Sequence, residues 1–396
     1  MLTWPDNALL DDQQRDLALR VLTFARQEIG PLAREADESL RLHHEVFRRM
    51  AEFGLYRHVI PEEYGGDGIA SAHICLIREM LASVSAHADT AFAMQGLGSY
   101  PIVSSGDEPL KQKYLPPIAT GQAVAALGMT EPGAGSDVAG ITTTARRDGD
   151  VYVLNGEKMF ISNAGDATQY VVLAKTDPEA GARGISAFVV EAGTPGFEAV
   201  GGFELLAAHP IGSLYFRDCR VPADNRLGAE GEGFRIAMRN LDIYRTSVGA
   251  AACGMGKAAL DEALAYGDQR RAFGQLIADF QAIQFRLADM ATSLEAARLL
   301  VYSAAAQRDR GMAPVTIPAS MAKLFATEAA FRIVDEALQL HGGHGLVRGC
   351  RVERLYREVR ALRIYEGTSE IQRLVIGREL VKQRRRQEDN FPSSSQ

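Results

Sequence analysis

The residues with the clearest chemical potential lie in the stretch 365–373, which reads YEGTSEIQR. It places the carboxylate of Glu366 beside Gly367, close to where a helix can start. Thr368 can cap that helix, and the residues that follow it favour a first helical turn. Glycine lets the backbone come close to a ligand. Glu366 is therefore a candidate base, and the alternative is a solvated glutamate in an ordinary turn.

A second stretch, 129–137, reads MTEPGAGSD and follows the apolar run 123–127. The pattern predicts a strand that runs into a loop rich in glycine and hydroxyl groups. Such a loop offers backbone N–H groups and small donors to an anionic or heteroaromatic ligand. It is not the G-x-G-x-x-G fingerprint, so the sequence does not indicate a Rossmann dinucleotide fold.

Composition excludes several function classes. The chain has 396 residues, 46% of them hydrophobic, and a formal net charge of −7 with both signs spread along it, which argues against a nucleic-acid surface. No run approaches the roughly 18 apolar residues of a membrane helix, and the first residues do not resemble a signal peptide. We expect a cytoplasmic protein without a membrane partner. We also expect reduced thiols and no metal site, because no zinc spacing joins Cys75, Cys219, Cys253 and Cys350.

The elements that must position these residues follow from periodicity. Helical spacing dominates the first third, over 11–32, 46–53, 72–84 and 110–119, the last broken by Pro116-Pro117. In the middle third, apolar runs on both sides of Asn155-Gly156 predict a hairpin, and 170–174, 185–190 and 214–222 predict further strands.

Helical spacing returns from Gly233. Small residues over 244–266 allow close helix approach, and an apolar stripe over 319–340 ends at Gly342-Gly343. We therefore expect a helical domain (1–122), a β domain (123–230), a helical bundle (231–386) and a disordered tail (387–396).

Together, the two chemical stretches resemble the acyl-CoA dehydrogenase family of flavoenzymes. Four further segments match in the family's order: VIPEEYGG at 59–66, KMFISN at 158–163, QRRAFG at 269–274 and QLHGG at 339–343. The resemblance covers nearly the whole chain. It implies an α+β architecture with an all-α amino domain, a central β-barrel-like domain and a carboxyl-terminal four-helix bundle.

The resemblance also implies a reaction, the α,β-dehydrogenation of an acyl-CoA thioester in fatty acid metabolism. Glu366 matches the base that removes the α-proton, while the β-hydrogen leaves as hydride to flavin N5. We expect a dry, apolar surrounding to raise the pKa of Glu366 toward the working pH. The backbone N–H of Glu366 and a flavin ribityl hydroxyl would bind the thioester oxygen.

Relatives differ in where the base stands. Some carry it on the helix that contains residues 241–245, where this chain has Tyr244, which is no base at neutral pH. A nitroalkane-oxidising branch has aspartate at the base position, and Glu366 argues against that branch.

The implied cofactor is FAD, held by residues of two subunits. Within one subunit the matched positions lie beside the ring or across it: Leu127, Met129, Thr130, Ser136, Phe160, Ile161 and Ser162, with Phe160 where relatives often have tryptophan. Residues that match contacts to the pyrophosphate and adenosine of a neighbouring subunit's flavin are Arg270, Phe273, Gln281, Gln339, Gly342 and Gly343. Thr368 and Glu370 complete the set. This arrangement implies a homotetramer, a dimer of dimers.

CoA contacts carry over to Ser136, Asp242, Arg245, Gly367 and Arg378. Asp242 and Arg245 lie three residues apart, so both can project from one helix face. An internal ion pair between them is the alternative interpretation.

Two features bear on the substrate. Dicarboxylyl-CoA relatives use an arginine in the helix that lines the acyl pocket, and residues 85–95 contain none, so we expect a neutral acyl group. The length and branching of the acyl chain stay open. It also stays open whether the thioester is carried by CoA or by a carrier protein. The segment 206–214 lacks the arginine that relatives usually carry there and has His209 nearby.

The resemblance favours an acyl-CoA dehydrogenase that passes electrons to an electron-transfer flavoprotein. One alternative is a flavin oxidase on the same fold that uses O₂. A second alternative is a catalytically idle scaffold protein, against which the intact Glu366, Ser136 and Arg270 argue.

Overall fold

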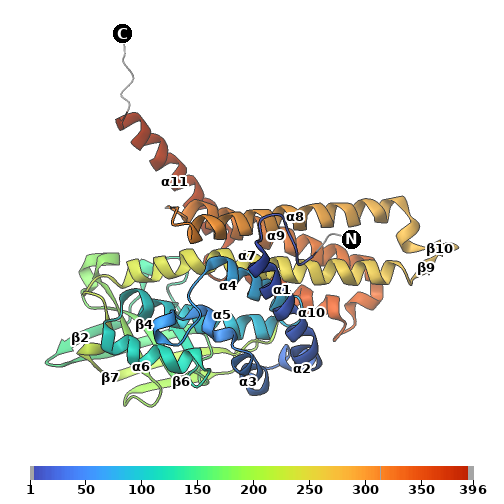
Figure 1. Cartoon of the computed structure of the whole chain (residues 1–396). Coiled ribbons are helices and arrows are strands. Elements are labelled where there is room, and N and C mark those ends of the chain that lie inside the picture. The colour runs from blue at the N-terminus through green and yellow to red at the C-terminus, as the bar shows by residue number, and fades with distance from the viewer. Residues whose placement is uncertain (1–3, 313, 391–396) are drawn as a thin grey trace, which may run out of the picture. The chain divides into compact units, whose positions relative to one another are not determined.

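The computed structural model describes residues 4–312 and 314–390 of the chain. Its contacts divide the chain into two compact units, Met1–Tyr244 and Arg245–Gln396, and the division falls inside the long helix α7, Gly233–Gly267 (Figure 1). The order of helices, then strands, then helices confirms the predicted fold class.

The first unit begins with helices close to the predicted ranges. Asp11 caps the first of them through a capping box with Gln14. A π-type turn over Ala25–Ile29 joins α1 to α2. The helices are α1 (Asp12–Phe24), α2 (Gly30–Ala36), α3 (His44–Glu52), α4 (Ser71–Ala82), α5 (Ala86–Ser105) and α6 (Glu108–Ala119).

Helix α6 corrects one prediction, because Pro116 and Pro117 lie inside the helix and do not break it. Prolines there remove the backbone donors that would reach the carbonyls of Gln112 and Lys113. Both of those residues are exposed, so water can satisfy their carbonyl oxygens, and the helix continues for its last turn.

Helix α5 connects the helical part of the first unit to its sheet. The Gln95 side chain, fully buried, donates to the Ala123 carbonyl at 2.8 Å and accepts from the Ala125 N–H at 2.7 Å. These bonds fix the start of strand β1 (Ala125–Gly128). A buried ion pair between Arg78 of α4 and Asp89 of α5, at 2.7 Å, joins the two helices.

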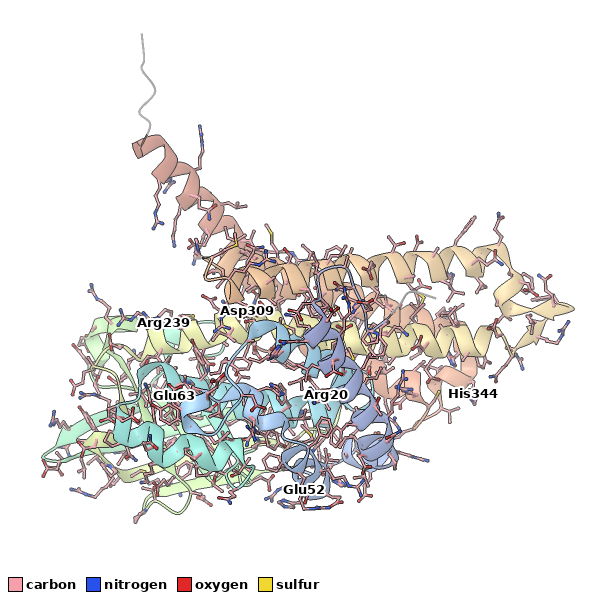
Figure 2. All side chains as sticks on the ribbon, viewed as in Figure 1. Arg20, Glu52, Glu63, Arg239, Asp309 and His344 are labelled. Atoms are coloured by element: carbon pink, nitrogen blue, oxygen red, sulfur yellow. The ribbon has the colours of Figure 1, made fainter. Side chains whose placement is uncertain are left out.

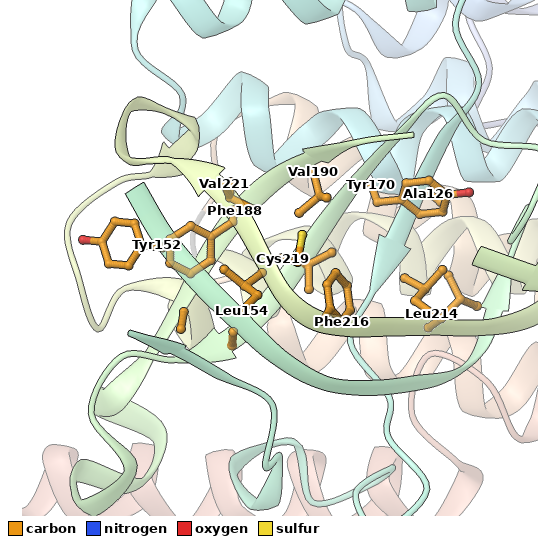
Figure 3. Close-up of a cluster of buried hydrophobic side chains, with 14 of the residues drawn as sticks. Ala126, Tyr152, Leu154, Tyr170, Phe188, Val190, Leu214, Phe216, Cys219 and Val221 are labelled. Carbon is orange, nitrogen blue, oxygen red and sulfur yellow. The ribbon is translucent and has the colours of Figure 1, made fainter. Parts of the chain in front are cut away.

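The strands form one eight-stranded sheet in the order β6-β7-β3-β2-β4-β5-β8, with β1 parallel to β4. Its core gathers large side chains such as Tyr152, Phe188 and Phe216 (Figure 3). The remaining strands are β2 (Thr144–Asp148), β3 (Val151–Ser162), β4 (Gln169–Lys175), β5 (Ile185–Glu191), β6 (Phe197–Gly201), β7 (Ile211–Pro222) and β8 (Arg226–Leu227).

The predicted hairpin at Asn155-Gly156 is wrong. Strand β3 runs through both residues, and its register with β7 shifts between Leu154 and Gly156. The Asn155 amide bonds with Asp218 instead, accepting from its backbone N–H at 2.9 Å. The hairpin turn lies earlier, where Asp148 pairs with Val151. Asn-Gly therefore builds a bulge here, a use that the local sequence does not distinguish from a turn.

The second unit is helical. The helices α8 and α9 lie alongside one another, and a short hairpin of β9 and β10 precedes α8 (Figure 1). After α7, the elements are β9 (Arg271–Ala272), β10 (Gln275–Leu276), α8 (Gln281–Asp309), α9 (Thr316–His341), α10 (Arg351–Val359) and α11 (Ser369–Asn390). Gly342 ends α9 with a φ of +57°, as its sequence predicts. We expected a disordered tail from residue 387; α11 instead continues to Asn390, and 391–396 lie outside the described residues.

Candidate functional site

The Glu366 segment forms a sharp turn immediately before α11. Glu366 has a φ of +53°, which is unusual for a residue with a side chain, and Gly367 has a φ of +92°. Thr368 caps α11, since its hydroxyl oxygen accepts from the Ile371 N–H at 3.3 Å. The predicted helix start and its cap are both present. The turn that precedes the cap holds Glu366 in a strained backbone conformation.

Three buried side chains donate to the carbonyl oxygens of this turn. Arg245 Nε lies 3.4 Å from the Glu366 oxygen, and Lys323 Nζ lies 2.7 Å from the Gly367 oxygen. Gln372 Nε2 donates to both oxygens, at 3.3 and 3.0 Å. These donors come from α7, α9 and α11, so three helices of the second unit over-determine the backbone of the candidate base.

A second connection between α9 and α11 reinforces the turn. The Ser369 hydroxyl donates to Glu328 Oε1 at 2.6 Å, and Arg363 donates to the same oxygen at 2.9 Å. Burial alone would raise the pKa of Glu328. The hydrogen bonds from Ser369 and Arg363 outweigh burial, so the pKa lies below its usual value. Glu328 is therefore a charged anchor for the first residue of α11.

In the first unit, a buried ion pair fixes the glycine-rich loop. Lys158 Nζ of β3 lies 2.7 Å from Glu131 Oε1, and both side chains are almost fully buried. Glu131 also accepts from the backbone of Thr142 and Thr143. Burial alone would raise the pKa of Glu131, but Lys158 and these hydrogen bonds lower it to about 2. The Lys158–Glu131 ion pair thus attaches the loop 129–137 to β3.

The loop and β3 bring several expected cofactor residues together. The Met159 N–H donates to the Thr130 carbonyl at 2.9 Å, and Lys158 donates to that of Met129 at 3.3 Å. Phe160, next along β3, is 51% exposed with a φ of +58°, so its ring is presented to the surface. Thr130 is half-buried, Ser136 is exposed, and Leu127 lies in β1. Ile161 is different, because its side chain packs in the sheet core and leaves only its backbone for a ligand.

The divergent segment 206–214 places His209 beside Ser162. Strand pairing of Ser162 with Ile211 brings the two side chains together, and His209 Nε2 lies 3.2 Å from the Ser162 hydroxyl oxygen. Burial lowers the pKa of His209 to about 4, so the ring is neutral at pH 7. The segment therefore carries a neutral ring and no arginine.

The residues expected to reach a neighbouring subunit's cofactor gather at one end of the helical unit. Arg270 and Gln281 are exposed, and Phe273, at the tip of the β9–β10 hairpin, is 97% exposed with a φ of +50°. The Tyr266 carbonyl accepts from the Arg270 N–H at 2.9 Å.

Tyr266 also connects this end of α7 to the end of α9. Its ring stacks on His341 at 4.3 Å between centroids and lies 6.1 Å from His344, which Figure 2 labels. Gln339, Gly342 and Gly343, all exposed, flank His341. The structure therefore brings together two groups that are about 70 residues apart in sequence.

The remaining candidates occupy α7 and α11. Tyr244 is fully buried, and a Cβ added to Gly96 of α5 would come within 1.9 Å of its hydroxyl oxygen, so the phenol fills the space that a glycine leaves. Asp242 lies two residues earlier on the same helix. Arg378 lies with Arg373, Lys382 and Arg385 around a shallow groove on α11, and Glu370 is exposed in its first turn.

Sequence reasoning missed the roles of Lys158 and Lys323. Each is a lysine among positions that periodicity assigns to the core, and Lys323 shares the buried stripe of α9 with Ala319, Ala322 and Ala326. A charged residue on an apolar face was a signal that a carboxylate or carbonyl partner existed, although not which one.

Within residues 4–312 and 314–390, no helix combines the length and apolarity needed to cross a bilayer. The same residues contain no group of three or more His, Cys, Asp or Glu side chains arranged to hold a metal ion.

Comparison with known proteins agrees with this arrangement. Three family models match consecutive parts of the chain: the acyl-CoA dehydrogenase N-terminal domain over residues 11–122, the middle domain over 126–219 and the C-terminal domain over 231–381. Together they span most of the sequence.

Individual relatives are similar along nearly their whole length. A probable acyl-CoA dehydrogenase, FadE25, of Mycobacterium tuberculosis is 40% identical over 96% of this chain and 100% of its own. The caffeyl-CoA reductase–Etf complex subunit CarC of Acetobacterium woodii is 41% identical over 95% and 98%. Among solved structures, butyryl-CoA dehydrogenase of Megasphaera elsdenii has a TM-score of 0.90 and 38% identity, with 94% of this chain and 99% of that chain covered.

Proposed function

Because this chain belongs to the acyl-CoA dehydrogenase family, and is thus an oxidoreductase of acyl-CoA thioesters, we propose that Glu366 is its catalytic base. The observation that carries the proposal is the strained turn at Glu366, held by Arg245, Lys323 and Gln372. Strained backbone persists only where its surroundings over-determine it, and such positions concentrate at active sites.

The proposed cofactor is FAD, on which the family depends. The first unit offers a flat, half-exposed Phe160 ring, the hydroxyls of Thr130 and Ser162, and the exposed backbone of the glycine-rich loop. This donor set fits an isoalloxazine ring, which has apolar faces and an edge of acceptor atoms. When bound, FAD supplies the acceptor for the hydride that leaves the β-carbon.

The chain's own contribution to the reaction is proton transfer and positioning. Glu366 would remove the α-proton, and its backbone N–H would bind the thioester oxygen, where negative charge develops. Gly367 has no side chain to obstruct that oxygen. Arg245 supports the backbone carbonyl of Glu366. Its contribution to CoA binding, and those of Ser136, Asp242 and Arg378, follow from the family resemblance.

We further propose that the flavin site is completed by a second copy of the chain in a homotetramer. The support is the exposed group at the end of the helical unit, where Arg270 and Phe273 lie near Gln339 and Gly342 through the Tyr266 stack. An exposed phenylalanine in a strained conformation suits a contact with another molecule. Arginine suits the diphosphate of FAD because its planar group donates paired hydrogen bonds.

The acyl group is proposed to be uncharged. Residues 85–95 contain no arginine, and the nearby Arg78 already forms two hydrogen bonds with Asp89, at 2.7 and 2.9 Å. A buried arginine in such a pair does not offer its charge to a substrate carboxylate.

For the electron acceptor we propose an electron-transfer flavoprotein. The support is the similarity to CarC, whose name places it in a complex with such a protein. The alternative is direct reaction with O₂, which defines an oxidase.

One experiment tests the proposed cofactor, acyl group and electron acceptor together. The purified protein is analysed for FAD released on denaturation and then mixed anaerobically with a panel of acyl-CoAs while flavin absorbance is followed. We expect FAD and fast bleaching by a neutral acyl-CoA, with reoxidation by an electron-transfer flavoprotein faster than by air. Release of FMN would overturn the cofactor assignment, glutaryl-CoA as the best substrate would overturn the neutral acyl group, and fast reoxidation by O₂ would identify an oxidase.

A further inference from the structure

Lys323 is a charged residue in a position that otherwise suits an alanine. It lies in the middle of α9, its side chain is fully buried, and its neighbours on the same stripe are the small residues Ala319, Ala322 and Ala326. Burying an ammonium group is costly unless the group is paired and hydrogen-bonded. A lysine at this place therefore requires a partner that uses its charge.

The partner is the turn of the proposed base. Lys323 Nζ donates to the Gly367 carbonyl at 2.7 Å, which is its one hydrogen bond within residues 4–312 and 314–390. This carbonyl follows Glu366 directly, and Arg245 donates to the preceding one at 3.4 Å. Each carbonyl of a turn with two consecutive positive φ angles thus receives a buried cationic donor.

The charges around Lys323 are of both signs. Arg245 lies on α7, Glu328 on α9, Glu366 in the turn before α11 and Glu370 in the first turn of α11, and each contributes to the electrostatics of Lys323. Burial lowers the pKa of Lys323 to about 8, although Glu366 raises it.

We propose that Lys323 is a positioning residue for the dehydrogenation: its ammonium holds the Glu366–Gly367 turn in the reactive conformation. The inference rests on the proposed function, because it takes Glu366 as the base. A lysine that only fills space would be replaceable by methionine, which has a similar length and no charge, without any effect on the turn.

This role predicts a specific pH dependence. Below pH 8, Lys323 is charged and holds the turn. Above pH 8 it loses its proton, its bond to the Gly367 carbonyl weakens, and the rate of flavin reduction falls. In Lys323→Met, this alkaline decline near pH 8 disappears.

The test uses the holoprotein, with Lys323→Met, Lys323→Gln and, as a control, Lys257→Met, whose lysine pairs with Asp261 on α7. Flavin reduction by the best saturated acyl-CoA of the panel is measured from pH 6 to 9. Hydrogen exchange is measured on the peptide that contains residues 365–372. For Lys323→Met we expect at least about a tenfold loss of kcat/KM at pH 7 and faster exchange in that peptide alone. Lys323→Gln keeps a donor but does not titrate, so we expect slower exchange than in Lys323→Met and the same loss of the alkaline decline.

The outcomes separate this inference from the proposed function. Wild-type exchange and a wild-type pH profile in both Lys323 variants would overturn the role of Lys323, even if Glu366→Gln is inactive. An active Glu366→Gln would instead overturn the assignment of the base. If Lys323→Met does not fold, hydrogen exchange in the wild-type protein tests the proposal. Exchange in the 365–372 peptide, corrected for its intrinsic dependence on pH, must accelerate above pH 8, and a constant corrected rate would contradict the proposal.

Discussion

Lys158 and Glu131 form an ion pair of 2.7 Å inside the first unit, with side chains that are 0% and 3% exposed. The pair joins strand β3 to the glycine-rich loop on which the proposed flavin site depends. Because neither charge can reach water, each requires the other, and a change to one leaves the other buried without its counter-charge.

Lys158→Met should therefore destabilise the protein by about 3–5 kcal/mol and release FAD, since breaking a buried pair costs that much. Urea unfolding and the flavin content after gel filtration measure both effects. Arg220→Met is the control, because it removes a surface pair with Asp148 in the same sheet, at 3.2 Å and about half exposed. It should cost about 1 kcal/mol or less. Full stability and full flavin content in Lys158→Met would show that the loop does not depend on the pair.

Arg270→Ala should weaken FAD retention by about tenfold or more, because a charge-assisted hydrogen bond to the diphosphate is lost. FAD-depleted protein should also dissociate more readily, since a ligand that bridges subunits links assembly to occupancy. Light scattering and flavin titration measure these effects, with Arg332→Ala, an exposed arginine on α9, as the control. A stable monomer with full flavin and full activity would rule out the shared site.

Acid should destabilise the first unit through His87. Burial, with smaller effects of His209 and His43, lowers the pKa of His87 from 6.5 to about 3. The unfolded chain therefore binds a proton that the folded protein excludes, and stability falls as pH decreases below 6.5, by about 1.4 kcal/mol per pH unit. Protonation would also disrupt the bond in which His87 Nε2 accepts from the His43 N–H at 3.0 Å.

His87→Gln should reduce this slope, and urea unfolding at pH 7 and pH 5 measures it. The same replacement of the exposed His44 serves as the control. An equal slope in wild type and His87→Gln would mean that other groups cause the acid sensitivity.

Local chemistry explains what the sequence could predict. The start of α11 was readable because Thr368 caps a helix whose bonds lie within a few residues. The bulge at Asn155 was not readable from the sequence, because its partner Asp218 is 63 residues away. Lys158 and Lys323 bond across 27 and 44 residues. A sequence pattern shows that such a lysine is unusual, but only the fold shows which oxygen it reaches.

The central claim is that Glu366 is the base, and Glu366→Gln tests it most directly. The change keeps the shape of the side chain, so FAD and the fold should be retained while the proton acceptor is lost. Stopped-flow flavin reduction by the best acyl-CoA of the panel should slow by at least about 10²-fold. Tyr244→Phe, which keeps the ring that packs against Gly96, should stay within a fewfold of wild type. Near-normal flavin reduction by Glu366→Gln, or a loss in Tyr244→Phe alone, would contradict the assignment of the base.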